Sequence, residues 1–122
     1  MTAIQKTLLF ILQRAPYGNS ATREALDAAL AAAAFEQNVQ ILFTGDGVWN
    51  LLSEQDSSSI NSKDTSKMLQ ALDYYDISDV FVDEISLQER GISATQFAIT
   101  AKTIDGDTLK QLIKTADCVI AL

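Results

Sequence analysis

Short apolar runs and amphipathic stretches alternate along this sequence. The runs KTLLFIL (residues 6–12) and VQILF (39–43) are continuously apolar, which is typical of strands buried on both faces of a sheet. Between them, ATREALDAALAAAAF (21–35) is rich in alanine, the residue that best favours helix. Its apolar face is formed at helical spacing by Leu26, Ala29, Leu30 and Ala33. The pattern predicts a strand, a helix and a second strand.

The rest of the chain continues this alternation. We expect, in order, a short helix after Gly47, an exposed polar loop (56–64), a helix (64–75), a strand (79–85), a helical turn ended by Gly91, a strand (96–103), a helix (105–116) and a strand (117–122). Strands that alternate with helices favour an α/β fold. We therefore predict one three-layer α/β/α domain over residues 1–122, with a five-stranded parallel sheet and helices on both faces.

The overall charge limits the class of partner. The chain of 122 residues is 48% hydrophobic, as expected of one globular domain, and its net charge is −7. An acidic surface repels phosphate backbones, so we expect no direct binding of nucleic acid.

The first apolar run is too short for a signal sequence or a membrane span. A single cysteine allows no internal disulfide. We expect a cytoplasmic protein without membrane contact.

The residue inventory excludes several kinds of chemistry. The sequence has no histidine, which excludes histidine-based triads and histidine metal sites. One cysteine excludes CxxC redox and zinc motifs. Carboxylates, hydroxyls, lysines and one thiol remain. We expect no metal and no cofactor.

Ligands of open α/β sheets bind beyond the carboxyl ends of the strands. The loop Tyr17–Ser20 precedes a helix and could attract an anion, but it lacks the glycine patterns of phosphate loops, and Asn19 or Ser20 as a simple helix cap is favoured. Asp46, between Gly45 and Gly47, could hold a magnesium ion. We favour a turn whose carboxylate faces water, because no second carboxylate is clearly paired with it.

Two features of the sequence suggest a partner-binding surface and a nucleophilic group. Trp49, Leu51 and Leu52 follow the glycine turn, and they either pack in the core or form an apolar patch that contacts a partner. Cys118 could be a nucleophile. We favour a buried structural residue, because it lies in an apolar strand, away from the carboxyl-end loops, and free cysteine is often fully buried.

Three stretches resemble a known family: APYGNSATREALDAALAAAAF, FTGDGVWNLL and LDYYDISDVFVDEISLQERGI. With the strand–helix order and the length, they are similar to the TusC/DsrF group of the DsrE/DsrF/DsrH superfamily, over essentially the whole chain. The distinctive parts are the R-E-x-L-D after the first loop, the DGV-aromatic-x-LL, and the SLxERG. None of them is a catalytic motif in itself.

The resemblance implies a five-stranded parallel sheet with helices on both faces. It also implies assembly with TusD/DsrE-like and TusB/DsrH-like subunits into a heterohexamer with two copies of each chain. In the Tus branch such complexes relay persulfide sulfur toward 2-thiouridine at the wobble position of tRNA. In the Dsr branch, related complexes serve dissimilatory sulfur oxidation.

The resemblance also assigns the sulfur-carrying cysteine to the TusD/DsrE-type subunit, at the end of the third strand and shortly before an Arg-Gly pair. Arg90 and Gly91 match that pair, and Asp83 then occupies the position of the cysteine. A carboxylate cannot carry a persulfide. The resemblance therefore implies a non-catalytic partner subunit. The residues alone also leave open a stand-alone small-molecule or anion-binding protein and an enzyme that uses Cys118.

Overall fold

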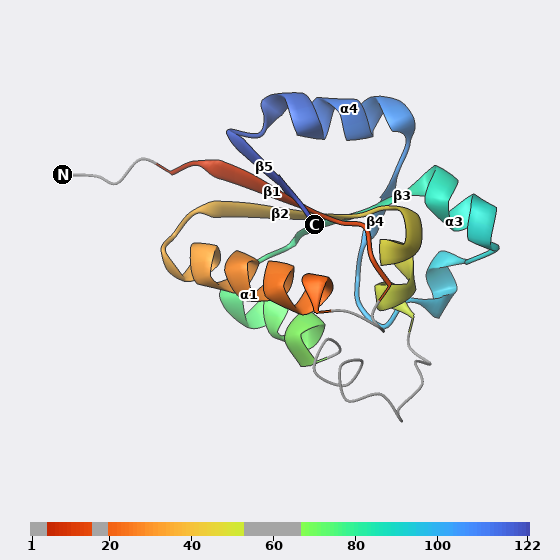
Figure 1. The fold of residues 1–122 in the computed structure, drawn as a ribbon, viewed down its shortest axis with the longest axis horizontal. Helices are drawn as coiled ribbons and strands as arrows, with labels where there is room; N and C mark the ends of the chain where they lie inside the picture. The colour runs from red at the N-terminus through yellow and green to blue at the C-terminus, as the bar shows by residue number, and fades with distance from the viewer. Residues whose placement is uncertain (1–4, 16–19, 53–66) are drawn as a thin grey trace.

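The computed structural model describes residues 5–15, 20–52 and 67–122. These residues form a five-stranded sheet in the order β4-β3-β2-β1-β5, and every neighbouring pair of strands is parallel (Figure 1). The strands are β1 (Thr7–Leu12), β2 (Asn38–Phe43), β3 (Asp79–Asp83), β4 (Lys102–Ile104) and β5 (Cys118–Ala121). The helices are α1 (Ala21–Ala34), α3 (Glu84–Arg90), α4 (Gly106–Thr115) and the 3₁₀ segments η1 (Gly45–Leu51), η2 (Leu72–Tyr75) and η3 (Ala94–Gln96). Residues 67–71 are helical and run into η2.

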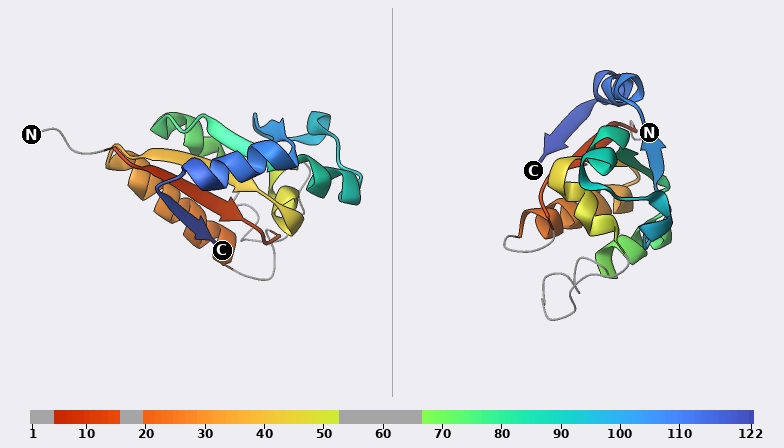
Figure 2. Two further views of the ribbon diagram at one scale, coloured as in Figure 1. Left: turned by 90° about the horizontal axis from the view of Figure 1, so that it is seen from above. Right: turned by 90° about the vertical axis from the view of Figure 1, so that its right-hand side faces the viewer.

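Helices cover both faces of the sheet, as predicted, but unequally. α1 and residues 67–75 lie on one face, and α4 lies on the other (Figures 1 and 2). The main core is on the α1 face, where Phe10, Leu12 and Phe43 are buried against α1, η1 and α3. On the opposite face, a smaller cluster of Leu9, Leu42 and Ile104 packs against the apolar side of α4.

Successive residues of each strand point to opposite faces, which explains why β1 is apolar from Leu8 to Leu12 and β2 from Ile41 to Phe43. In β1, Phe10 and Leu12 belong to the main core, whereas Leu9 belongs to the cluster under α4. β2 lies in register beside it, with Phe10 next to Ile41 and Leu12 next to Phe43. A central parallel strand has helices on both sides and therefore favours apolar residues on both of its faces.

The third and fourth strands differ from the prediction. β3 ends at Asp83, and Glu84 and Ile85 already belong to α3. The fourth strand was predicted over residues 96–103 but includes only Lys102–Ile104. Residues 94–96 form η3 instead, because the Ser93 side chain accepts from the Thr95 backbone N–H while the Gln96 side chain caps the Ser93 N–H. The predicted loop 56–64 lies outside the described residues.

The two edges of the sheet are chemically different. β4 forms one edge and is followed by Asp105, whose carboxylate accepts the Thr108 N–H at 2.8 Å at the start of α4. This hydrogen bond lowers the pKa of Asp105. β5 forms the other edge and pairs only with β1. Among the residues that the structure describes, no helix is long and apolar enough to cross a membrane.

Candidate functional site at the carboxyl ends of the strands

A hydrogen-bond chain joins β3, α3 and η1 where the strands end. Asp83 is the last residue of β3 and the N-cap of α3. Its carboxylate accepts from the Ser86 hydroxyl at 2.6 Å, and the Ser86 oxygen in turn accepts from the Gly45 N–H at 2.8 Å. Ser86 is buried, and its hydroxyl satisfies the N–H of the half-buried Gly45. These two hydrogen bonds fix the start of η1 against α3.

Arg90 makes a second link between the same elements. Its Nε and Nη2 donate to the Asp46 Oδ1 at 3.2 and 3.0 Å, and its Nη1 donates to the Ser86 carbonyl at 3.1 Å. The Asp46 side chain is 64% exposed, so the ion pair lies at the surface. Asp46 was predicted to face water without a paired carboxylate. It does face solvent, and its partner is a guanidinium.

Two of the distinctive motifs therefore contact each other. GDG supplies Gly45 and Asp46, and SLxERG supplies Ser86 and Arg90. Gly47 allows the close approach, because a Cβ at this position would lie 1.9 Å from the Leu12 carbonyl oxygen. Gly91 ends α3 at a φ of 63°, as predicted from its place in the sequence. Through these hydrogen bonds and this close packing, the motif residues hold η1, α3 and β1 together at the carboxyl-end site.

A second polar contact was missed by sequence reasoning. Asn50 is fully buried, and its Nδ2 donates to the carbonyls of Arg14 and Gly47 at 2.9 and 2.8 Å. The buried Thr22 hydroxyl donates to the same Arg14 carbonyl at 3.1 Å. These bonds hold η1 and α1 to the chain that leaves β1. In the sequence, the signal for Asn50 is one polar residue within the apolar stretch 48–52, and nothing marks Thr22.

The chemical capacity of this site follows from its groups. Asp83, Ser86, Arg90 and Asp46 offer carboxylates, a hydroxyl and a guanidinium, and no thiol lies there, because the only cysteine of the sequence is Cys118. Ser86 is already bonded to Asp83 and to the Gly45 N–H. The sequence has no histidine, and no lysine of the described residues is hydrogen-bonded to Ser86. Within the described part of the chain, no three Cys, Asp or Glu side chains lie close enough to hold a metal ion.

The predicted apolar patch divides into a core residue and two half-buried ones. Leu51 is fully buried in the main core, so it cannot serve as an interface anchor in this conformation. Trp49 and Leu52 are half-buried. Leu52 forms an isolated antiparallel bridge with Phe97, and the Leu51 carbonyl accepts from the Ala98 N–H at 2.6 Å. A partner-binding role for Trp49 and Leu52 stays a prediction.

The burial predicted for Cys118 is wrong. Cys118 is exposed, because β5 is an edge strand and Cys118 is its first residue. The predicted position along the strand is right: Cys118 lies beside Leu8, at the amino end of the sheet. Asp83 is about 16 Å further along the strand direction and three strands across, at the opposite end. Cys118 therefore lies far from the carboxyl-end site.

The loop Tyr17–Ser20 falls mostly outside the described residues, and only Ser20 can be placed. Ser20 is the N-cap residue of α1, but its side chain makes no capping hydrogen bond. Its hydroxyl donates to the Glu24 carboxylate at 3.1 Å instead. The helix cap predicted for Ser20 is thus right in position and wrong in its bonding.

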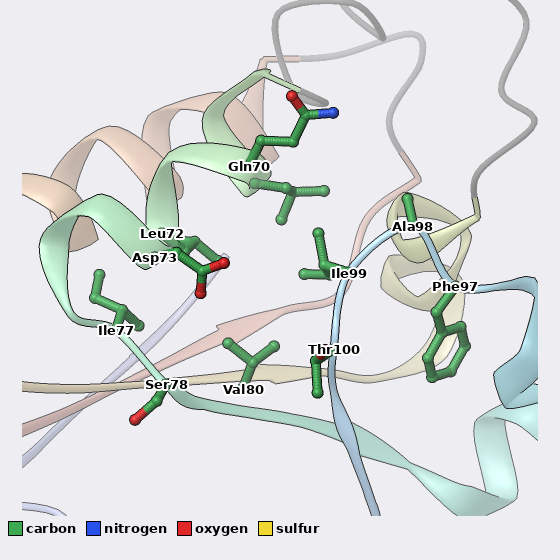
Figure 3. Close-up of a pocket in the computed structure, with 11 residues that line it drawn as sticks. Gln70, Leu72, Asp73, Ile77, Ser78, Val80, Phe97, Ala98, Ile99 and Thr100 are labelled. Carbon is green, nitrogen blue, oxygen red and sulfur yellow. The ribbon is translucent and has the colours of Figure 1, made fainter.

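A pocket of about 600 Å³ opens between residues 69–80 and residues 97–100 (Figure 3). Leu72, Ile77, Val80 and Ile99 contribute apolar side chains to its lining, and Asp73 is the one ionisable group among the described residues that line it. It lies beside the first residues of β3, where β4 has not yet begun, and thus away from the carboxyl-end site. The sequence did not reveal it, because residues 96–103 read as one continuous strand.

Comparison with known proteins agrees with the motifs. A model of the DsrE/DsrF-like family matches residues 6–122. The chain is 39% identical over 109 residues to a Protein TusC homolog of Vibrio parahaemolyticus, covering 89% of this chain and 92% of that protein. It is 35% identical over 119 residues to a Protein TusC homolog of Pseudomonas aeruginosa, covering 98% and 100%.

Two further relatives extend the comparison. The chain is 34% identical over 116 residues to Protein TusC of Shigella flexneri serotype 5b, covering 94% and 98%. In structure, it is similar to the ychN protein from E. coli, with a TM-score of 0.81, 22% identity and coverage of 98% and 100%. The structural likeness concerns the fold, whereas the matches in sequence show the family. This chain belongs to the DsrE/DsrF-like family.

Proposed function

We propose that this protein is a non-catalytic, TusC-like subunit of a heterohexameric sulfur-relay complex that passes persulfide sulfur toward 2-thiouridine at the tRNA wobble position in the cytoplasm. The proposal rests on one observation above others. Asp83 ends β3, at the position that the family resemblance assigns to the sulfur-carrying cysteine of a partner subunit. A carboxylate cannot form a persulfide, so a sulfur carrier at this position would have to come from another chain.

The bonding of Asp83 supports a structural role at this position. Its carboxylate holds the Ser86 hydroxyl, and Arg90 holds Asp46 from the same helix. In this arrangement, the residues that match the family pattern stabilise the surface next to the strand ends. Trp49 and Leu52, half-buried on and just after η1, are the proposed contacts with TusD/DsrE-like and TusB/DsrH-like subunits.

Genetic complementation tests the function directly. Deletion of the gene is expected to abolish 2-thiouridine in tRNA, and both the wild-type chain and Cys118→Ala are expected to restore it. Liquid chromatography of tRNA hydrolysates measures the thiolated nucleoside. Normal 2-thiouridine in the deletion strain, with a defect in sulfur oxidation instead, would support the alternative of a DsrF-type subunit.

Assembly tests the proposed interface. Native mass spectrometry of the chain co-expressed with TusD-like and TusB-like chains is expected to show a hexamer with two copies of each subunit. Trp49→Ala is expected to weaken this assembly while the isolated variant stays folded. Ile113→Ser, at an exposed position of α4 on the opposite face, is the matched control. An intact hexamer with Trp49→Ala would contradict the proposed contact.

A further inference from the structure

A second surface of the molecule exposes large aromatic side chains. Phe35 is 78% exposed, Tyr74 is 89% exposed and Tyr75 is 45% exposed. Phe35 follows α1, both tyrosines end η2, and η2 packs against α1. In Figure 1 both helix ends lie at the amino end of the sheet, opposite to η1 and α3. This surface is therefore distinct from the carboxyl-end site, and its role does not depend on the proposed function.

Carboxylates surround these aromatic residues. Glu36, Asp76 and Asp79 line an open hollow of about 300 Å³ together with Tyr75, and Asp73 precedes the tyrosines. None of the four carboxylates forms an ion pair with a described residue. On the described segments that meet here (5–7, 33–39 and 72–79), Lys6 is the one basic residue. We call the set Phe35, Glu36, Asp73, Tyr74, Tyr75, Asp76 and Asp79 the amino-end surface.

Two of these carboxylates occupy positions that favour glycine. Glu36 and Asp76 have φ angles of 64° and 57°, in the left-handed region. The Glu36 N–H donates to Ala33 and the Gln37 N–H to Ala32, and the Asp76 and Ile77 N–H groups donate to Asp73 and Leu72. This paired pattern is the helix ending that normally carries glycine.

The end of α3 has the same hydrogen-bond pattern with the usual glycine. After α3, Gly91 and Ile92 donate to Gln88 and Leu87 in the same pattern, with glycine at the left-handed position. At the other two helix ends the left-handed residue is an acid, Glu36 or Asp76. Its negative charge is also unfavourable next to the negative end of the helix dipole. Residues that are unfavourable for local stability are commonly found at functional surfaces.

We propose that the amino-end surface is a docking site for a protein whose contacting surface carries lysine and arginine residues around an apolar centre. Exposed aromatic residues are the side chains that most often anchor protein interfaces. Unpaired carboxylates around them select a basic partner by charge complementarity, and arginine or lysine can also stack on the tyrosine rings. A second copy of this chain is disfavoured, because each copy carries a net charge of −7.

Photo-crosslinking followed by affinity measurement tests this proposal. Tyr74 is replaced by p-benzoylphenylalanine, and the chain is irradiated in its host cell. Ile113, exposed on α4, is replaced in the same way as the control position. We expect one protein to be linked through Tyr74 only, at a peptide that contains lysine or arginine. Capture alone does not support the proposal, so the linked protein is then purified and titrated against variants.

The variants separate the aromatic contribution from the charge. Phe35→Ser with Tyr74→Ser is expected to weaken binding at least tenfold. Glu36→Gly with Asp76→Gly removes two charges, keeps both helix endings, and is expected to weaken binding three- to tenfold and to reduce its salt dependence. Ile113→Ser is expected to change the affinity less than twofold. Thermal melts confirm that each variant is folded.

Several results would overturn the proposal. They are the absence of a product specific to Tyr74, a product with a second copy of this chain, a linked peptide without basic residues, and an affinity that is unchanged by either double variant.

Discussion

At the scale of single residues, Gly47 is required by the space around it. A Cβ would lie 1.9 Å from the Leu12 carbonyl oxygen and 2.7 Å from its carbon, and both are backbone atoms that no rotamer change can move. Gly47→Ala must therefore push η1 away from β1. We expect a loss of roughly 3 kcal/mol of unfolding free energy or more. Urea denaturation measures this loss.

Gly106 provides the matched control. It lies in the first turn of α4, and a Cβ there meets no atom within 4 Å. Gly106→Ala is expected to leave stability unchanged or to raise it by about 0.5 kcal/mol, because alanine favours helix. If Gly47→Ala proved as harmless as Gly106→Ala, the close packing of η1 on β1 would be wrong.

Cys118 gives a second prediction at this scale. Because the residue is exposed at an edge strand, Cys118→Ala is expected to change stability by less than about 0.5 kcal/mol. The thiol is also expected to react readily with iodoacetamide in the folded protein. This reaction would report exposure alone, and does not indicate a nucleophilic role. Slow alkylation that becomes fast only in denaturant would contradict the exposed position.

At the scale of elements, the contact between α3 and η1 depends more on its buried bond than on its surface ion pair. Ser86→Ala leaves the N–H of the half-buried Gly45 without its side-chain partner, so we expect a loss of about 1–3 kcal/mol. Asp46→Ala removes only an exposed pair with Arg90, and we expect a loss below about 1 kcal/mol. Denaturant titrations of both variants compare the two losses, and the opposite order would refute this account.

The end of α1 gives another prediction. Glu36 is held at a φ of 64°, where a side chain is strained and glycine is not. Glu36→Gly is expected to raise the unfolding free energy by roughly 0.5–1 kcal/mol, after allowing for the added freedom of the unfolded chain. Glu36→Ala keeps the strain and is expected to bring no such gain. Thermal unfolding in parallel measures both, and equal effects of glycine and alanine would argue against strain.

At the scale of the whole molecule, the two ends of the sheet present different surfaces. The carboxyl ends carry the packed motifs around Asp83 and Arg90, and the amino ends carry exposed aromatic residues with carboxylates. Both ends belong to a chain of net charge −7. Under the proposed function in tRNA modification, we expect this chain to act through other proteins rather than through direct contact with the tRNA.

This charge leads to the last prediction. The isolated chain is expected to show no binding of tRNA up to about 100 µM at physiological salt, because phosphate contacts need clustered lysine or arginine. Fluorescence anisotropy of labelled tRNA measures the affinity, and lysozyme as a basic protein gives a positive control. A micromolar, salt-sensitive affinity of the isolated chain would contradict the prediction.

Much of the architecture could be predicted from local patterns. The mainly apolar runs at 6–12 and 39–43, separated by an alanine-rich helix, favour strands covered on both faces, and both runs form such strands. Gly91 marked the end of α3, and the motif residues indicated the family. These features are local or periodic, so they can be read without knowledge of distant contacts.

Burial and long-range pairing could not be predicted from local patterns. Cys118 and Leu51 both lie in apolar stretches, but one is exposed at a sheet edge and the other fills the core, because strand order and helix position are not local properties. The bonds from Ser86 to Gly45 and from Arg90 to Asp46 join residues more than forty positions apart. The amino-end surface likewise arises only where α1 and η2 meet, so no single stretch of sequence could reveal it.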